Sequence, residues 1–345
     1  MLRIVASAAG ISLLPLAVKQ VKAETLPWQT GGNQEPVSLD FSWVMEKKTR
    51  AEEEVKGQRK VILLGSPRTG STLLGELLAS HSQTSYFMEP LFAMMALGQL
   101  DWNYVLEGKI ERGEVPLAAV TALMEGIFSC DQTVIQRLED WSRVPHTSVS
   151  SVPVSVCRSS QNLLAKVVRL HGRQAGEVVS QVKEVKVVHI VRDPRGVTAS
   201  LRAQQEEWGE RTGEDYCRNL LADIALEDQL GPERYIRVRY EDLVEDPMKV
   251  LERIGAFLGV AVTEEMREAV GVRMFGKKDG TEVPVTNSLA ASNTTEYYST
   301  VRGPGHRHDS WRQRLRPEDI SVLECGVCGE VMDRLGYHKL TTDRK

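Results

Sequence analysis

Apolar residues gather in short runs along this chain, and the spacing changes from one run to the next. Two largely apolar runs, Val61 to Gly65 and Val185 to Val191, have the length of strands buried on both faces. Each is followed by a polar turn and then by a segment with apolar positions on one helical face. Strands that alternate with helices predict an α/β fold, a mainly parallel sheet flanked by helices on both faces.

The turn after the first strand, Ser66 to Gly70, opens a predicted helix over Ser71 to Ser80. Backbone N–H groups at a helix start lack intrahelical partners and lie at the positive end of the helix dipole, so they suit an anion. The spacing Gly65-x-x-x-x-Gly70-Ser71-Thr72 is P-loop-like, but Ser71 occupies the position of the phosphate-binding lysine. This difference counts against a kinase or an ATPase. A plain connecting turn has a similar composition and is the alternative.

The second strand runs into Arg192-Asp-Pro-Arg195 and then into a predicted helix that contains Ser200. Arg192 and Ser200 are eight residues apart, so a guanidinium at the strand end and a hydroxyl about two turns along the helix can converge on one phosphate. A surface ion pair of Arg192 with Asp193 or Glu206 is the alternative. The two strand-turn-helix segments together predict a site that grips both ends of one nucleotide.

The chain resembles the sulfotransferases that use a nucleotide sulfate, in particular the secretory-pathway carbohydrate 6-O-sulfotransferases. Besides the two loops, the resemblance rests on Tyr86-Phe-Met-Glu-Pro-Leu91, Lys166-Val-Val-Arg-Leu170, Tyr235-Ile-Arg-Val-Arg-Tyr-Glu-Asp-Leu243, Ser310-Trp-Arg312 and Cys328-x-x-x-Met332-x-x-Leu-Gly-Tyr337. It covers Arg59 to His338 and implies the sulfotransferase fold. It also implies transfer of sulfonate from 3′-phosphoadenosine 5′-phosphosulfate (PAPS) to the 6-position of N-acetylglucosamine or galactose in a glycan such as keratan sulfate. The first loop reads Arg-Thr-Gly-Ser-Thr where many relatives carry Arg-Ser-Gly-Ser-Ser, which keeps the hydroxyl groups.

The resemblance also implies which residues bind the nucleotide. Arg192 and Ser200 would bind the 3′-phosphate, and Trp311 with Arg312 would form a lid, although Trp311 would equally serve to pin the C-terminal helix. Arg239 lies on a period-two strand, where one face is core and the other can reach the nucleotide. The 5′-phosphosulfate would lie on Ser66, Pro67, Arg68, Thr69, Gly70, Ser71 and Thr72.

Sulfonate transfer asks the protein mainly for positioning, because a sulfonate carries less charge than a terminal phosphate, and we expect no metal. We predict that Arg68 stabilises charge on the leaving oxygen. Glu89, which follows an apolar segment, is the predicted base that takes the proton from the sugar hydroxyl. A capping or ion-paired glutamate is the alternative for Glu89, and His306 and His308 are alternative bases.

Other polar residues and loops bear on the acceptor side. Lys166 and Arg169 lie on a predicted strand or its rim, where they would meet sulfate or an anionic acceptor, or form an exposed basic pair. The segments Ser142 to Ser160 and Phe275 to Asp309 are weakly periodic and are predicted as loops that face the acceptor. They contain no readable code for the acceptor sugar.

Cysteine usage indicates an oxidising compartment. The chain contains five cysteines, Cys130, Cys157, Cys217, Cys325 and Cys328. The resemblance pairs Cys130 with Cys157 and Cys217 with Cys328, and leaves Cys325 free. The Cys325-x-x-Cys328 spacing also occurs in zinc and redox sites, but no second Cys or His pair follows it. The sequon Asn293-Thr-Thr295 predicts N-glycosylation, which agrees with export.

The N-terminus predicts entry into the secretory pathway. Arg3 precedes the apolar stretch Ile4 to Val18, about 15 residues, which is short for a membrane span but suits a signal-peptide core. Val21 and Ala23 fit a cleavage site before Glu24, and an uncleaved signal anchor in the membrane is the alternative. We therefore predict a signal peptide or anchor at 1–23, a stem at 24–57, a catalytic domain at 58–340 and a polar tail at 341–345. The catalytic domain would lie in the Golgi lumen or be secreted.

Composition agrees with this prediction. A chain of 345 residues that is 41% hydrophobic and 26% charged suffices for one large α/β domain. A net charge of −4 gives no electrostatic case for nucleic acid, so the nucleotide is a co-substrate. We predict a PAPS-dependent carbohydrate sulfotransferase with a glycan acceptor. A catalytically inactive nucleotide- or glycan-binding relative and a P-loop kinase are the alternatives.

Overall fold

Five parallel strands form the central sheet, in the order β2-β3-β1-β4-β5. The computed structural model describes residues 57–92, 117–143, 149–203, 213–278, 281–282 and 306–340. The strands are β1 (Arg59–Gly65), β2 (Thr84–Met88), β3 (Asn162–Val167), β4 (Val185–Val191) and β5 (Tyr235–Arg239). The predicted parallel sheet is confirmed, and its carboxyl ends meet at one edge because all the strands run the same way.

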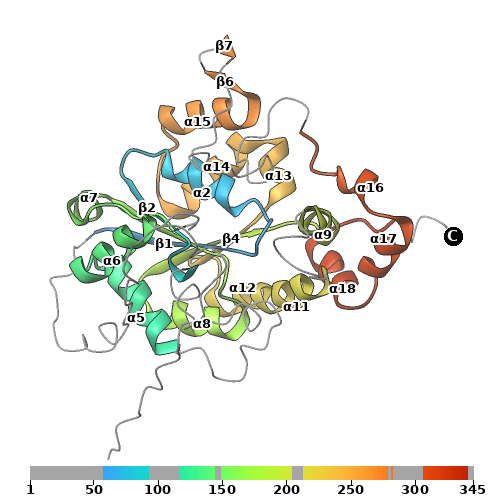
Figure 1. Ribbon diagram of the computed structural model, residues 1–345, viewed down its shortest axis with the longest axis horizontal. Coiled ribbons are helices and arrows are strands. Elements are labelled where there is room, and N and C mark those ends of the chain that lie inside the picture. The colour runs from blue at the N-terminus through green and yellow to red at the C-terminus, as the bar shows by residue number, and fades with distance from the viewer. Residues whose placement is uncertain are drawn as a thin grey trace, which may run out of the picture. The chain divides into compact units, whose positions relative to one another are not determined.

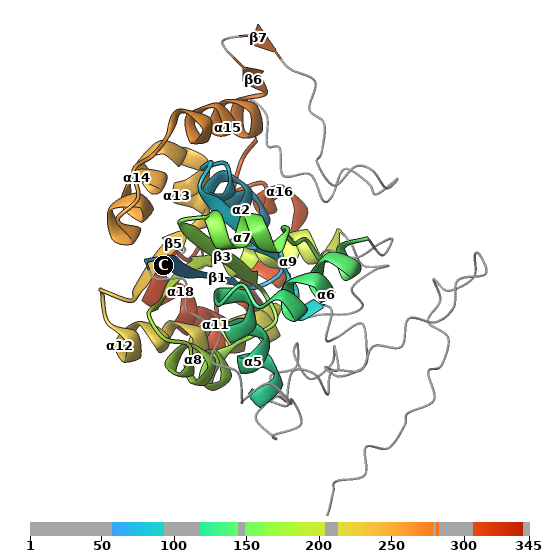
Figure 2. The same cartoon turned by 90° about the vertical axis from the view of Figure 1, so that its left-hand side faces the viewer.

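Helices cover both faces of this sheet, as predicted (Figures 1 and 2). One face carries α2 (Ser71–Ala79), α13 (Tyr240–Glu245), α14 (Pro247–Leu258) and α15 (Glu264–Phe275). The other carries α5 (Leu117–Phe128), α8 (Gly172–Gln181), α11 (Gly213–Ile224) and α12 (Leu226–Leu230). The remaining elements are α6 (Gln132–Ser142), α7 (Val154–Ser159), α9 (Pro194–Arg202), α16 (Trp311–Arg314), α17 (Pro317–Leu323), α18 (Gly326–Leu335) and the small hairpin of β6 (Lys277–Lys278) and β7 (Thr281–Glu282).

Strands β1 and β4, the two apolar runs of the sequence, are buried on both faces, which explains their composition. Ile62 and Leu63, successive residues that point to opposite faces, are 1% and 0% exposed. The polar residues that interrupt the second run have partners of their own. Lys186 donates to the carbonyl oxygen of Phe257 at 2.6 Å, and His189 Nδ1 lies 2.5 Å from Tyr235 Oη. Burial lowers the pKa of His189 to about 4, so its ring is neutral at neutral pH.

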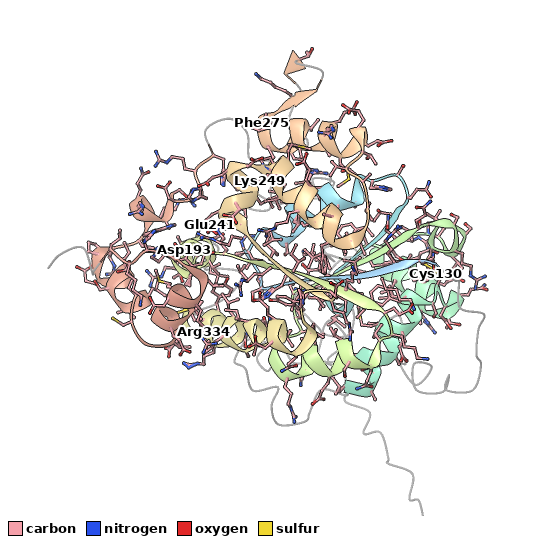
Figure 3. The ribbon with its side chains drawn as sticks, turned by 180° about the vertical axis from the view of Figure 1, so that it is seen from behind. Cys130, Asp193, Glu241, Lys249, Phe275 and Arg334 are labelled. Atoms are coloured by element: carbon pink, nitrogen blue, oxygen red, sulfur yellow. A yellow bond between two sulfur atoms is a disulfide. The ribbon has the colours of Figure 1, made fainter. Side chains whose placement is uncertain are left out.

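A second core joins the C-terminal helices to α9 and α11, with Trp311 and Leu220 among its buried members. The structure contains a disulfide between Cys217 in α11 and Cys328 in α18, and another between Cys130 and Cys157. Cys325 is a free, exposed thiol. In Figure 3, Cys130 lies on the α5–α6 side of the sheet, and Asp193 and Glu241 lie together toward its other end.

The structure adds α7 and the hairpin of β6 and β7 to segments predicted as loops, and several other predicted segments lie outside the described residues. Helix α7 lies inside the segment Ser142 to Ser160, which was predicted as a loop; with six residues it is too short to show a helical period. The segment 1–23, nearly all of 24–57, Asn293 and the tail 341–345 lie outside the described residues. No helix among the described residues is both long enough and apolar enough to cross a membrane.

Candidate active site

The carboxyl edge of the sheet gathers most of the predicted site residues. The chain places β2 and β3 on one side of β1, and β4 and β5 on the other, so the loop after β1 lies where the strand order changes direction. In open parallel sheets this is where ligands bind. The strand ends supply Ser66 to Thr72 after β1, Glu89 after β2, Lys166 in β3 and Arg169 after it, Arg192 after β4, and Arg239 in β5 with Tyr240 and Glu241 at the start of α13.

The first loop is a tight turn that leaves the start of α2 open. The hydroxyl of Thr69 donates to the carbonyl oxygen of Ser66 at 2.7 Å. Gly70 has φ of 87°, and a Cβ there would lie 2.4 Å from the Tyr240 ring, so only glycine fits. No side chain caps α2, and its first N–H groups therefore remain available to an anion.

The second loop touches the first directly. The guanidinium of Arg192 donates to the carbonyl oxygen of Arg68 at 2.8 Å and stacks on the Tyr240 ring, 4.3 Å from its centroid. Arg68 in turn donates through Nε to Ser200 Oγ at 3.0 Å. Ser200 thus contacts the arginine of the first loop, and the residues assigned to the two ends of the nucleotide form one continuous cluster.

Two guanidinium groups at this edge each have a buried N–H group without a hydrogen-bond acceptor among the described residues. Nε of Arg192 and Nε of Arg239 are buried and have no hydrogen-bond partner among the described residues. Buried donors normally have a partner. Positively charged donors at the ends of β4 and β5 fit a phosphate group, which offers several acceptor oxygens.

Glu89 lies in a buried cluster with two cations. Lys166 Nζ donates to Glu89 Oε1 at 2.8 Å and to Thr72 Oγ1 at 2.7 Å, and Arg169 forms an ion pair with Glu89 Oε2. The side chains of Lys166, Arg169 and Glu89 are 3%, 4% and 11% exposed, so Lys166 and Arg169 do not form an exposed pair. The ion-paired alternative for Glu89 therefore describes its contacts here.

Backbone conformation marks the same residues. Arg68 and Glu89, the two predicted catalytic residues, have φ of 69° and 49°, in the left-handed region that residues other than glycine seldom adopt. Such backbone strain concentrates at functional sites, where the surrounding structure enforces it. Cys130 and Glu184 also have positive φ and lie away from this site, so the conformation of Arg68 and Glu89 agrees with a functional role and does not by itself assign one.

Lys166 supplies the ammonium group that the first loop lacks. It comes from β3, the neighbour of β1, and its contact with Thr72 places it at the start of α2. Burial lowers the pKa of Lys166 to about 7; the charge of Arg68 acts in the same direction and that of Glu76 opposes it. The sequence signal was a lysine near the end of an apolar strand, but its distance from the loop depends on strand order.

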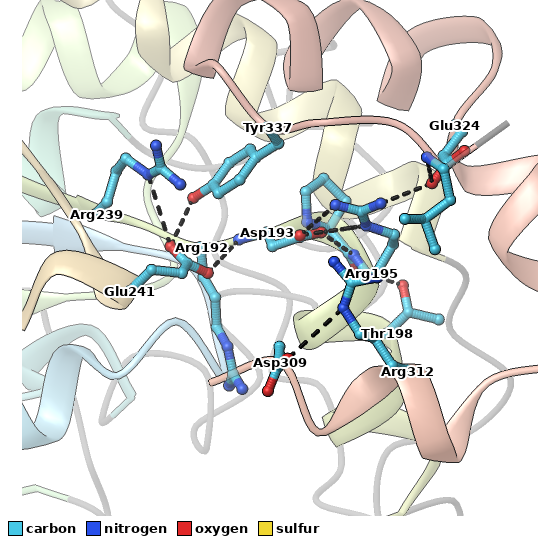
Figure 4. Close-up of polar contacts among 12 residues, drawn as sticks. Arg192, Asp193, Arg195, Thr198, Arg239, Glu241, Asp309, Arg312, Glu324 and Tyr337 are labelled. Carbon is cyan, nitrogen blue, oxygen red and sulfur yellow. Dashed lines mark hydrogen bonds and ion pairs between the residues drawn. The ribbon is translucent and has the colours of Figure 1, made fainter. Parts of the chain in front are cut away.

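The predicted lid and the alternative bases occupy different environments. Trp311 is 3% exposed and packs under Arg195, whose guanidinium lies 4.1 Å from the ring centroid, so the indole pins the C-terminal helices. Arg312 is exposed and pairs with Asp309 (Figure 4). His306 Nε2 lies 2.9 Å from Tyr240 Oη, beside the cluster, whereas His308 pairs with Glu245 on the surface.

Comparison with known proteins shows the family of this chain. The sulfotransferase family matches residues 60–264, more than half of the chain, and the protein therefore belongs to that family. Carbohydrate sulfotransferase 4 of Mus musculus is 24% identical, over 90% of this chain and 89% of the relative. Carbohydrate sulfotransferase 6 of Homo sapiens is 23% identical, over 82% of each chain. The sulfotransferase domain from the curacin biosynthetic pathway aligns with a TM-score of 0.49 at 20% identity, covering 81% of this chain and 98% of that domain.

Proposed function

We propose that this protein transfers sulfonate from PAPS to a carbohydrate hydroxyl, the 6-hydroxyl of N-acetylglucosamine or galactose in a glycan. Membership of the sulfotransferase family supports the reaction class, and the carbohydrate sulfotransferases that match most of the chain support the acceptor class. The contact of Arg192 with Arg68, at 2.8 Å, carries the proposal, because it brings two anion-binding loops within reach of one nucleotide.

Each end of the nucleotide would meet its own set of donors. The N–H groups at the start of α2, with Arg68 and the hydroxyls of Ser71 and Thr72, would hold the 5′-phosphosulfate. Arg192 and its neighbour Arg239 would hold the 3′-phosphate through buried Nε groups that have no hydrogen-bond partner among the described residues, although Arg239 Nε also lies 3.9 Å from Glu241 Oε2. A triphosphate-binding kinase is disfavoured, because Ser71 replaces the loop lysine.

The chemistry rests on the cluster at the ends of β2 and β3. The bound nucleotide supplies the sulfonate, and positively charged Lys166 and Arg68 would stabilise negative charge on the oxygen that leaves. Glu89 would accept the proton of the attacking sugar hydroxyl. Its oxygens pair with Lys166 and Arg169 in this structure, so the acceptor must displace one of these contacts, a rearrangement that substrate binding often brings about.

A transfer assay tests the function. Purified protein is incubated with labelled PAPS and a panel of glycans that includes desulfated keratan chains, and mass spectrometry locates the added sulfate. We expect sulfate at the 6-position of N-acetylglucosamine or galactose in wild-type protein and none with Glu89→Gln. Sulfate on peptide tyrosine or on a small phenol instead of the glycans would contradict the acceptor class.

We further propose that the protein works in the lumen of the secretory pathway, on a signal anchor or after signal cleavage. Two disulfides in the structure support an oxidising compartment. In secreting cells, an endoglycosidase should shift the wild-type band and leave the Asn293→Gln band in place. A wild-type band that does not shift would count against glycosylation at Asn293.

A further inference from the structure

The closing segment of the chain reaches the second loop although it has no part in the proposed chemistry. Tyr337, just after α18, donates its hydroxyl proton to Glu241 Oε2 at 2.9 Å. The other oxygen of Glu241 accepts the backbone N–H of Asp193 at 3.0 Å (Figure 4). Tyr337, Glu241 and Asp193 are buried, 6%, 6% and 5% exposed. One carboxylate therefore ties the segment after α18 to the backbone that follows β4.

A second tyrosine holds the preceding residue. The hydroxyl of Tyr216 in α11 accepts the backbone N–H of Arg192 at 3.1 Å and donates to the carbonyl oxygen of Arg192 at 2.8 Å. A single buried side chain thus satisfies both backbone groups of the arginine assigned to the 3′-phosphate. Both hydrogen bonds act on the backbone, so they fix where the Arg192 side chain starts.

The two tyrosines come from helices that are joined covalently. Tyr216 precedes Cys217, whose disulfide partner Cys328 lies in α18, the helix that leads to Tyr337. Arg239 packs over the Tyr337 ring, 4.3 Å from its centroid, and its Nε lies 3.9 Å from Glu241 Oε2. Burial raises the pKa of both the Glu241 carboxyl and the Tyr337 hydroxyl, so Tyr337 keeps the proton that it donates.

We propose that Tyr216, Glu241 and Tyr337 form a clamp that positions the Arg192–Asp193 backbone for the 3′-phosphate of the nucleotide. This inference rests on the proposed function. Tyr216 and Glu241 hydrogen-bond to backbone groups and Tyr337 hydrogen-bonds to Glu241, so the three are positioning residues. A guanidinium on a fixed backbone loses less freedom when it binds a phosphate, which strengthens nucleotide binding without changing the chemical step.

Tyrosine-to-phenylalanine variants of the full chain test this clamp, because each removes a single hydroxyl. Tyr337→Phe and Tyr216→Phe should each raise the KM for PAPS and the Kd for its product 3′-phosphoadenosine 5′-phosphate (PAP) about fivefold, the scale of one hydrogen bond. The kcat at saturating PAPS and the KM for the glycan should stay at wild-type values. The matched control is Tyr235→Phe, which removes a buried hydroxyl bonded to His189 at the other end of β5.

The control separates positioning from general loss of stability. We expect all three variants to lower the melting temperature, and only the two clamp variants to weaken PAP binding measured by calorimetry. Two results would overturn the clamp and leave the proposed function standing. In one, the clamp variants bind PAP as tightly as Tyr235→Phe does. In the other, they lose kcat while the KM for PAPS is unchanged. A wild-type chain that binds no PAP overturns the proposed function and the inference with it. If one clamp variant fails to fold, the other, from a different helix, carries the same expectation.

Discussion

The two halves of the sheet edge hold their charged side chains in different ways. At the ends of β2 and β3, Lys166 and Arg169 pair with Glu89 side chain to side chain, inside the protein. At the end of β4, the Tyr216 hydroxyl holds the backbone of Arg192 and the Glu241 carboxylate holds that of Asp193, while Arg192 Nε has no hydrogen-bond partner among the described residues. Coupled buried charges suit proton transfer and charge development, whereas a fixed cation with a spare donor suits binding. Substitutions in the first half should therefore change kcat, and those in the second half the affinity for PAPS.

The largest effect should come from Glu89→Gln. Glutamine keeps the size of the side chain but cannot accept a proton, so kcat should fall about 10²- to 10⁴-fold, with PAP binding by calorimetry near wild type. Glu227→Gln is the control, since it neutralises another ion-paired glutamate, the partner of Arg237, away from the cluster. If Glu89→Gln kept its turnover, Glu89 would not be the base, and His306 would be the next candidate.

Substitution of Lys166 should give the next largest loss of kcat, and Lys166 should also make kcat depend on pH. Its pKa is lowered to about 7, so the ammonium form predominates below pH 7, and a rate that needs the charge should fall as pH rises through that value. Lys166→Met should lower kcat about 10²- to 10³-fold. Lys166→Arg keeps the charge at all these pH values, so any activity that it retains should lose the alkaline fall. The pH profile of kcat measures this, and the same fall in Lys166→Arg would assign it to another group.

Arg192→Ala should chiefly weaken nucleotide binding. Loss of a charged hydrogen-bond donor to a phosphate costs about 1.5–3 kcal/mol, or roughly 10- to 150-fold in the Kd for PAP. The kcat at saturating PAPS should change much less, because Lys166 and Glu89 remain in place. An Arg192→Ala variant with normal PAP affinity and low kcat would reverse the comparison between the two halves.

The smallest effect concerns the point where the halves meet. Gly70→Ala places a methyl group against Tyr240, on which Arg192 stacks. Gly259→Ala is a matched control, since Gly259 has the same left-handed conformation and an added Cβ there would meet only Arg59 Nε, at 4.0 Å. The left-handed conformation should cost each variant about 1–2 kcal/mol of folding stability. Gly70→Ala should lose more than that, because its methyl group also meets the Tyr240 ring. Thermal unfolding measures both losses. Equal losses would indicate that the Tyr240 ring moves aside freely.

The sequence predicted the parts of this fold that depend on local pattern. Buried strands, the open start of α2 and the arginine after β4 follow from short stretches of chain, and so does the parallel sheet that joins them. The cluster of Glu89 with Lys166 and Arg169 depends on β3 lying between β2 and β1, which no local period encodes. The hydrogen bond of Tyr337 to Glu241 joins residues 96 positions apart, so no local pattern could predict it either. The sequence left two roles open for Trp311, and its burial and its packing under Arg195 in the structure favour the structural role.

The most direct test compares the binding of PAP with that of AMP, which lacks the 3′-phosphate, to wild-type, Arg192→Ala and Arg68→Ala proteins by calorimetry. We expect wild type to prefer PAP strongly, Arg192→Ala to lose most of this preference while it binds AMP normally, and Arg68→Ala to bind both ligands more weakly. If Arg192→Ala weakened PAP and AMP equally, Arg192 would not bind the 3′-phosphate, and a nucleotide held at both ends would be contradicted.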